Sequence, residues 1–456
     1  MKIVIAGLTQ VGICLAETLS KENHDVMVID QDGNKVNAVT DRYNVSGVTG
    51  NCASKSTLLR AGVDTADVCV TLTPSDETNL CTCMMAKKCG TRYTVAKLDN
   101  PELTGEQKYY EQEFMVDYVL TPKEDTALEI ARHIGLPGTV RADAFFSFDT
   151  TMFRVTADKE NGLAGMHVKD IRNLFDTDML VGTICRNGKL LIPDGTSVIE
   201  EKDEVYLIVP HSSMTTVMMK LGMMRKPVKN VLIIGGGDIA RSLAGLLLEN
   251  KKKVTILDID RSRCADLAQI LPQATISCAA EIDSKVLLEE GIDKADVCVS
   301  LTGRDDTNLV LSMFAWSCGV SSVITKVNST TYESLLNRVN IDITISPVLI
   351  SVERITGFIR NVEVPNDAGN DIACMYQIAG GVAEAIEFIA YDNFKAKDIP
   401  LKDKGFKLKK NLLIGMVLKD GVAVIPGGNT SIQPGDHVVV ITKRDSGLKT
   451  LNDILS

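Results

Sequence analysis

Short apolar runs alternate with amphipathic stretches from the first residues onward. The apolar runs cover residues 2–7, 25–30 and 67–73. The segments between them have apolar residues at helical spacing and are predicted to be helices through Leu19, around Val36 and at residues 56–62, while a turn is predicted at Val48. Buried strands that alternate with helices are the βαβ pattern of a parallel, doubly wound sheet. The pattern therefore predicts a Rossmann-like α/β domain at the start of the chain.

The same pattern begins again near Lys229, which indicates an internal duplication. The spacing between matched residues is 228 in the glycine-rich turn and the second strand, and 229 after one inserted residue. The matched pairs are Gly7 and Gly235, Asp30 and Asp258, Asn79 and Asn308, and Lys97 and Lys326. The chain is thus predicted to carry two Rossmann-like domains in tandem.

A smaller strand-rich unit follows each of these domains, and its two copies cover residues 181–209 and 414–441. Alternating apolar residues flank Asn187-Gly188 and Asp420-Gly421, which are typical pairs for two-residue hairpin turns. We interpret these units as small α+β lobes. Segments 121–136 and 346–359 have a proline near the start and amphipathic spacing, so they are predicted to be connecting helices.

These patterns divide the 456 residues into six predicted segments. The predicted boundaries are 1–120 for the first Rossmann-like domain, 121–139 for a connecting helix, 140–224 for the first lobe, 228–345 for the second Rossmann-like domain, 346–367 for the second connecting helix and 368–453 for the second lobe.

Composition excludes several classes of function. With 49 Lys and Arg against 59 Asp and Glu, the net charge of −10 argues against a broad nucleic-acid footprint. No span approaches the ~20 apolar residues that a membrane crossing requires, and no targeting segment is expected. The 12 cysteines form no CxxC pair and the five histidines are dispersed, so we expect reduced thiols in a cytosolic protein and no metal site.

The turn after the first strand of the second copy has the GxGxxG/A pattern, from Gly235 through Gly237 to Ala240. Small residues there allow a pyrophosphate to approach the backbone at the start of a helix. Asp258 ends the next strand, where an acid binds a ribose hydroxyl and repels a 2′-phosphate. An NAD-type site is predicted, although Arg261 and Arg263 are nearby; we expect both to be solvated helix residues.

The first copy departs from this pattern at Thr9, which replaces the middle glycine between Gly7 and Gly12. A β-branched side chain there either crowds a phosphate or donates its hydroxyl to it. The first site is therefore predicted to be degenerate, weaker or differently selective, although Asp30 keeps the ribose-binding position. ATP or ADP is a candidate ligand for one of the two sites.

Further polar residues recur at the carboxyl ends of strands, where open α/β sheets bind ligands. Asn79 and Asn308 are candidates for ligand contacts or for hydrogen bonds at a helix start, and Lys97 and Lys326 are candidates for phosphate contacts or solvated surface residues. The complete predicted cofactor site comprises Gly7, Thr9, Gln10, Val11, Gly12, Asp30, Thr73, Asn79 and Lys97 in the first copy, and Gly235, Gly237, Asp238, Ile239, Asp258, Thr302, Asn308 and Lys326 in the second.

The glycine-rich turns, the acidic strand ends, segments 66–79 and 295–308, and the proline-glycine turns of the lobes resemble the KTN/RCK family of TrkA type, over nearly the whole chain. This resemblance implies binding of NAD(H) and adenine nucleotides. It also implies a homotetrameric ring on the cytoplasmic side of a Trk-type membrane potassium-translocating subunit. Thr9, Lys97 and Lys326 depart from the family pattern, which has glycine at the first position and often arginine at the other two.

Two alternatives stay open, an NAD-dependent oxidoreductase and a nucleotide sensor for a different partner. The fold alone does not decide between them. No His, Lys or Tyr paired with a carboxylate suggests acid–base work for hydride transfer, and each copy leaves little chain for a substrate domain. A regulatory, non-enzymatic role is therefore the prediction.

Overall fold

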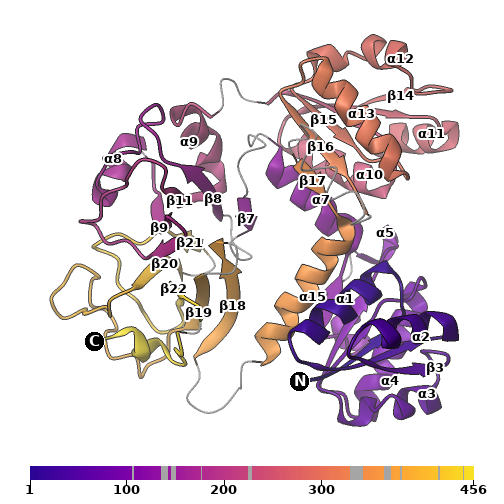
Figure 1. Ribbon diagram of the computed structural model, residues 1–456, viewed down its shortest axis with the longest axis horizontal. Helices are drawn as coiled ribbons and strands as arrows, with labels where there is room; N and C mark the ends of the chain where they lie inside the picture. Colours follow the sequence, from indigo (N-terminus) through magenta and orange to yellow (C-terminus); the bar gives the residue numbers. More distant parts are fainter. Residues whose placement is uncertain are drawn as a thin grey trace. The chain divides into compact units, whose positions relative to one another are not determined.

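The computed structural model describes residues 1–104, 107–134, 142–144, 150–175, 177–223, 228–328, 343–363, 371–379, 383–419, 422–444 and 446–456 (Figure 1). The chain forms two compact units, and each is built from two separate segments. The first unit contains Met1–Ile134 and Val228–Ile359, and the second contains Gly135–Pro227 and Arg360–Ser456.

The first half of the first unit is a six-stranded parallel sheet in the order β3-β2-β1-β4-β5-β6. Its strands are β1 (Lys2–Ala6), β2 (Asp25–Asp30), β3 (Ser46–Thr49), β4 (Val68–Thr71), β5 (Tyr93–Lys97) and β6 (Tyr118–Leu120). Its helices are α1 (Gln10–Lys21), α2 (Gly33–Arg42), α3 (Lys55–Arg60), η1 (Val63–Thr65), α4 (Asp76–Cys89), α5 (Pro101–Thr104), α6 (Gln107–Glu113) and α7 (Pro122–His133). Residues 3–6 of β1 are fully buried because helices cover a parallel sheet on both faces.

The second half repeats this arrangement with the strand order β14-β13-β12-β15-β16-β17. Its strands are β12 (Asn230–Ile234), β13 (Lys253–Asp258), β14 (Thr275–Cys278), β15 (Val297–Ser300), β16 (Ser322–Lys326) and β17 (Ile343–Ile345). Its helices are α10 (Asp238–Glu249), α11 (Arg261–Ile270), α12 (Ser284–Glu289), η4 (Ile292–Lys294), α13 (Asp305–Ser317) and α15 (Pro347–Glu363). The predicted tandem duplication of a doubly wound parallel sheet is confirmed.

One local prediction was wrong. Val48, predicted to lie in a turn, belongs to strand β3, which pairs in parallel with β2 through Ile29 and Val48. This edge strand has four residues, of which only Val48 is buried. A segment with one apolar residue shows no alternation of apolar and polar positions, so its sequence does not predict a strand. The pairing with β2 makes this segment a strand.

The two halves of the first unit exchange the helices that follow their last strands. Helix α7 lies against α10 (Figure 1), and its residues Ala127 and Ile130 belong to the apolar core of the second half. Helix α15 reaches the first half, where Phe358 stacks on Tyr118 with ring centroids 5.1 Å apart. The sequence predicted both helices and their proline starts, and the structure shows that each one packs on the other copy.

The second unit contains two five-stranded antiparallel sheets, ordered β10-β9-β11-β8-β7 and β18-β19-β22-β20-β21. The first lobe has β7 (Ala142–Ala144), β8 (Thr150–Thr156), η2 (Val168–Asp170), α8 (Ile171–Phe175), β9 (Leu180–Arg186), β10 (Lys189–Leu191), β11 (Glu204–Pro210), η3 (His211–Ser213) and α9 (Met214–Lys220). The second has β18 (Ile372–Ile378), β19 (Ala383–Ile389), β20 (Leu412–Lys419), β21 (Val422–Val424), β22 (His437–Lys443) and η7 (Leu451–Ile454). The smaller repeat thus forms a pair of small mixed lobes, as predicted.

The two lobes share an apolar core between their sheets. Ile208 on β11 and Ile441 on β22 are equivalent residues, 233 positions apart, and both are fully buried in this core. The equivalent glycines Gly182 and Gly415 face them: a Cβ at Gly182 would lie 3.3 Å from Ile441 Cδ1 of the other sheet, and one at Gly415 would lie 3.5 Å from Ile208 Cδ1. Glycine at these positions lets the two sheets approach closely.

The hairpin predicted at Asn187-Gly188 is confirmed. Strands β9 and β10 pair through Arg186 and Lys189, and the two turn residues have φ of 51° and 72°. The equivalent strands of the second lobe pair through Lys419 and Val422, and the predicted turn pair 420–421 between them lies outside the described residues. Parts of the predicted connecting segments, 135–139 and 364–367, lie outside them too.

The described cysteines are free thiols. Burial raises the pKa of Cys83 and of Cys298 to about 12, so both behave as small apolar residues. Within the described ranges, no helix has the length and apolar composition needed to cross a bilayer.

Candidate functional site

Each glycine-rich turn lies where the strand order of its sheet reverses. In the first half this is the point between β1 and β4, and in the second half it is between β12 and β15. The crevice outside the carboxyl ends of strands at such a switch point is the usual ligand position in open α/β sheets. The topology therefore brings the turn, the acidic end of the second strand and the polar end of β4 or β15 to one edge in each half.

The first glycine of each turn is required by the protein itself. Gly7 has φ of +107° and Gly235 has φ of +100°, a region that side chains disfavour. A Cβ at Gly7 would lie 2.7 Å from Thr73 N, and one at Gly235 would lie 2.8 Å from Thr302 N. These glycines thus fix the contact between the turn and the adjacent strand, whether or not a ligand is present.

The protein's own structure does not require the glycine that precedes helix α10 in the second copy. Gly237 is the N-cap of α10 with φ of −68° and ψ of −177°, and a Cβ there would meet no atom within 4 Å. Its counterpart Thr9 caps α1 with nearly the same backbone angles and accepts a hydrogen bond from Gly12 N at 3.5 Å. The backbone therefore tolerates threonine, and the space above Gly237 is open to a ligand.

The remaining predicted residues of the turns occupy the first turn of each helix. Gln10 is exposed and Val11 is half-buried. A Cβ at Gly12 would lie 2.1 Å from Gly7 O, so this position is closed to side chains. In the second copy Ile239 packs against the apolar core, and Asp238 makes an ion pair described below.

The acids at the strand ends bind the glycine-rich turns directly. Asp30 Oδ2 accepts a hydrogen bond from Leu8 N at 2.7 Å, and Asp258 Oδ2 accepts one from Gly236 N at 2.5 Å. Their second oxygens accept from the backbone two residues further on, Asp32 N and Asp260 N. Both acids therefore hold the turn in place, and Asp30 is the more exposed of the two.

Asp258 has an additional partner on α11. Arg263, expected to be a solvated helix residue, is 47% exposed there and also donates from its guanidinium to both Asp258 oxygens, at 2.9 and 3.1 Å. Burial alone would raise the pKa of the Asp258 carboxyl, but the bonds from Asp260 N and Gly236 N and the Arg263 charge outweigh it, so the net pKa is lowered. Asp258 is thus held ionised, with Arg263 bonded to both of its oxygens.

The predicted polar residues just after β4 and β15, and in the first turns of α4 and α13, form the same hydrogen bonds in both copies. Asn79 is fully buried; its Oδ1 accepts from Thr73 N and Thr73 Oγ1 at 2.8 and 2.7 Å, and its Nδ2 donates to Lys97 O at 2.9 Å. The corresponding bonds of Asn308 to Thr302 and Lys326 are 2.8, 2.6 and 3.0 Å. Both asparagines thus bond the segments at the ends of two neighbouring strands, and neither is an N-cap, because Ser75 and Arg304 hold those positions.

Lys97 is buried, which contradicts the alternative of a solvated surface residue. Its Nζ lies 2.5 Å from Asp99 Oδ2. Lys326 is half-buried, and burial lowers the pKa of its ammonium group, partly opposed by Asp305. As phosphate contacts both lysines stay predictions.

Two further acids at this edge were missed by the choice of candidate residues. The buried Asp76 accepts hydrogen bonds from Asp99 N and Asn100 N, and its equivalent Asp305 accepts one from Asn328 N. They hold the start of the loop after β5 or β16. Their recurrence in both copies, three residues before the candidate asparagines, was a signal in the sequence.

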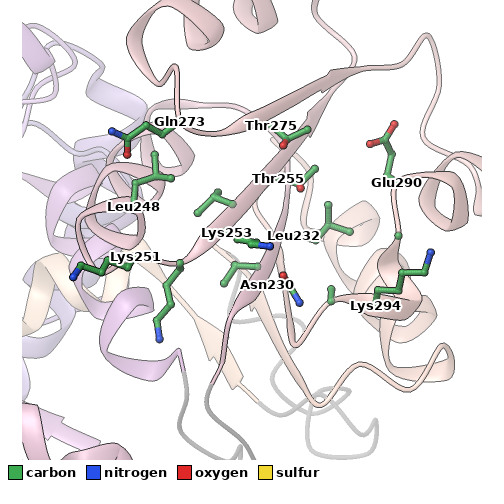
Figure 2. A pocket seen from close by; sticks show the side chains of 15 residues that line it. Asn230, Leu232, Leu248, Lys251, Lys253, Thr255, Gln273, Thr275, Glu290 and Lys294 are labelled. Atoms are coloured by element: carbon green, nitrogen blue, oxygen red, sulfur yellow. The ribbon is translucent and has the colours of Figure 1, made fainter.

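A cavity of about 770 Å³ lies at the opposite, amino-terminal edge of the second sheet (Figure 2). Asn230, Thr255 and Thr275 line it, and Lys251, Lys253 and Lys294 extend from its rim. None of the predicted site residues lines this cavity. No group of three or more His, Cys, Asp or Glu residues in the described part of the chain is arranged to hold a metal ion.

This architecture defines a class of protein: tandem Rossmann-like domains with a glycine-rich turn and an acidic strand end at each switch point, and paired small lobes. Comparison with known proteins agrees. The TrkA-N domain family matches residues 3–122 and 231–347, and the TrkA-C domain family matches residues 152–222 and 386–455. The chain belongs to the TrkA family.

Relatives of the same length carry this name. The chain is 30% identical over 445 residues to the Trk system potassium uptake protein TrkA of Vibrio alginolyticus, covering 96% of this chain and 95% of that protein. It is 29% identical over 446 residues to the TrkA homolog of Archaeoglobus fulgidus, covering 98% of each. The resemblance noted from the motifs is therefore confirmed at the level of the family.

Solved structures share the fold. The GsuK channel bound to NAD matches with a TM-score of 0.62 and 14% identity, over 97% of this chain and 77% of that one. The GsuK RCK domain matches with a TM-score of 0.60 and 14% identity, over 97% and 92%. The described architecture is thus that of a tandem RCK protein.

Proposed function

We propose that this chain is the nucleotide-binding regulatory subunit of a Trk-type potassium uptake system. It binds NAD(H) or an adenine nucleotide at its glycine-rich turns and controls potassium transport by a change of conformation. Its partner is a membrane potassium-translocating subunit, on whose cytoplasmic side it assembles as a homotetrameric ring. Potassium uptake is the function named for its full-length relatives.

One observation carries the proposal of nucleotide binding. Gly237 is a glycine that neither its backbone angles nor any neighbouring atom requires. It lies at the start of α10, where backbone N–H groups and the helix dipole attract an anion. An open space at this place fits a pyrophosphate, and Asp258 behind it fixes the turn.

The acids argue for ligands with a free ribose. A carboxylate at Asp30 or Asp258 accepts hydrogen bonds from a 2′,3′-diol and repels a 2′-phosphate. Arg263 partly offsets the charge of Asp258 in the second site, which weakens the repulsion of a 2′-phosphate there, whereas Asp30 in the first site is bonded to backbone groups at Leu8 and Asp32. We propose that NAD(H) is favoured over NADP(H) because an acid ends this strand in both copies, less strongly at the second site, and that the first site, with its more open acid and Thr9 in place of glycine, has a different selectivity.

Regulation needs no covalent step. A ligand that binds one arrangement of the two halves better shifts the population toward it by its differential affinity. The exchanged helices α7 and α15 connect the halves. A conformational change in one half therefore shifts the packing of the other. With a coupling of about 1–3 kcal/mol, ligand would change transport several-fold to about a hundredfold.

Two measurements test the proposal. Calorimetric titration of the full chain with NADH, NADPH, ADP and ATP identifies the ligand. Asp258→Ala should weaken NADH binding at the second site by about 1.5–3 kcal/mol, as expected for a charge-assisted hydrogen bond. Potassium flux in liposomes that carry a Trk-type membrane subunit should depend on both the chain and the nucleotide.

The alternatives give other results. Flux that is indifferent to the chain and to nucleotides would overturn the regulatory role and favour a sensor for a different partner. Steady oxidation of NADH in the presence of a small carbonyl substrate would favour an oxidoreductase.

A further inference from the structure

An ion pair joins the two halves of the first unit at the second glycine-rich turn. Lys123 on α7 of the first half donates from Nζ to Asp238 Oδ2 at 2.6 Å. The same ammonium group donates to Asp99 O, at the carboxyl end of β5, at 3.1 Å. The two side chains are 36% and 44% exposed, so the pair is accessible from the crevice and is not part of the core.

Asp238 is the first residue of α10, directly after Gly237. A carboxylate in the first turn of a helix is stabilised by the dipole when no other anion is present. A ligand phosphate bound over Gly237 would compete with this carboxylate for the same positive end of the helix. The charge of Asp238 therefore opposes ligand binding unless Lys123 neutralises it.

The matching positions at the first glycine-rich turn and at the start of α15 do not carry this pair of charges. The residue that matches Asp238 in the first turn is Gln10, and the residue that matches Lys123, counted from the helix-initiating Pro122 and Pro347, is Val348. Neither carries a charge. The duplication thus placed an acid and a base at one of its two sites, although the backbone is the same in both.

We propose that Lys123 is a phosphate-binding residue of the second nucleotide site, supplied by the first half of the chain. In the free protein its ammonium group is paired with Asp238. When a nucleotide binds at the second turn, the ammonium group bonds a pyrophosphate oxygen and Asp238 turns toward solvent. The second site is then complete only while α7 packs on α10, so the packing of the two halves sets its affinity. This inference rests on the proposed nucleotide binding.

Charge variants of the full chain test this proposal, with NADH and ADP titrated by calorimetry. Asp238→Asn removes the competing anion and frees Lys123, so affinity should rise about three- to tenfold. Lys123→Gln leaves Asp238 unpaired, so affinity should fall by about the same factor. The double variant, in which both charges are absent, should bind within about twofold of the wild type because the net charge at the turn is again zero.

Opposite signs for the two single variants distinguish a ligand contact from a structural ion pair, whose loss would weaken binding in both. Lys123→Arg should retain the affinity. In the Asp258→Ala background, where the second site is weakened, the same changes should leave binding at the first site unchanged. Lys21→Gln removes a lysine from a comparable helix ion pair with Glu17, at the far end of α1, and serves as the matched control.

The outcomes separate the two proposals. Absence of nucleotide binding by the wild type would overturn the proposed function itself. If the wild type binds and Asp258→Ala weakens it, but Asp238→Asn and Lys123→Gln leave affinity unchanged or both lower it, the role of Lys123 is wrong. Thermal unfolding of each variant shows that a changed affinity is not a loss of fold.

Discussion

The side-chain amide of Asn79 donates to the backbone carbonyl of Lys97 at 2.9 Å, and thereby fixes the carboxyl end of β4 to that of β5. Asn308 and Lys326 repeat the bond at 3.0 Å in the second half. Both asparagines are completely buried. These residues shape the crevice that faces the glycine-rich turn.

Replacing this asparagine should therefore reduce stability and not only binding. Asn308→Ala leaves Thr302 N and Lys326 O without their partner, so the free energy of unfolding should fall by about 2–4 kcal/mol. Urea denaturation measures this change. The control is Asn250→Ala, an exposed asparagine whose amide makes one bond, to Leu246 O. Lost nucleotide binding at unchanged stability would instead make Asn308 a direct ligand contact.

Asp258 should give the protein a pH-dependent stability. Its pKa is lower in the folded protein than its ordinary value, so the ionised carboxylate stabilises the fold above about pH 4, and this stabilisation is lost as the pH falls through the folded pKa. At pH 7, Asp258→Asn should cost about 1.5–3 kcal/mol, and the difference from the wild type should shrink toward pH 3. Urea denaturation at several pH values tests this. A constant difference for Asp258→Asn across this pH range would rule out the charge as the cause.

Gly237→Thr and Thr9→Gly, each of which introduces the residue of the other copy, should change ligand affinity without reducing the stability of the fold. The Cβ added by Gly237→Thr meets no atom within 4 Å, and the hydroxyl supplies a helix cap as Thr9 does in α1, so stability should be unchanged or slightly higher. Affinity at the second site should fall by about 1–3 kcal/mol, the usual cost of extra atoms in a filled space. Thr9→Gly should strengthen binding at the first site. Calorimetry and urea denaturation together test both changes; a Gly237→Thr variant that binds like the wild type would show that the space above Gly237 is not used.

Packing of the core between the two lobes should depend on Gly415. A Cβ there would lie 2.8 Å from Ile441 Cδ1 on the neighbouring strand β22 and 3.5 Å from Ile208 Cδ1 of the other lobe, so Gly415→Ala should lower the free energy of unfolding by about 1–3 kcal/mol. Shortening the neighbour with Ile441→Val should recover part of the loss in the double variant. Gly245→Ala is the matched control, because no atom lies within 4 Å of its Cβ in helix α10, and it should stabilise by about 0.5–1 kcal/mol. Equal effects of the two glycine substitutions would contradict the packing explanation.

Local patterns of the sequence were sufficient for the strands and helices with a strong period or a clear start. Residues 2–7 and 67–73 are continuous apolar runs because both faces of a parallel strand are buried, and Pro122 and Pro347 start their helices because the missing N–H costs nothing there. The duplication itself could be read from the spacing of Gly7 and Gly235. Val48 could not be placed, because an edge strand of four residues with one buried side chain has no period.

The glycines of the two turns match one sequence motif but have different structural roles. Gly7, Gly235 and Gly237 belong to one pattern, but positive φ and close backbone neighbours explain the first two, and open space distinguishes the third. Both acids were correctly placed at the strand ends. Their bonds to Leu8 N and Gly236 N, and the Arg263 cover over Asp258, depend on distances that side-chain types do not specify.

The sequence by itself determined the two Rossmann-like copies, the two lobes and the position of each glycine-rich turn, because all of these depend on contacts between residues close along the chain or on a strict repeat. Tertiary structure alone decided that α7 and α15 are exchanged between the copies and that Lys123 meets Asp238, 115 residues away. Helical periodicity shows that one face of α7 must be buried. It does not show against which partner, since the apolar surfaces of the two copies are nearly alike, and only the packing of the whole unit distinguishes them.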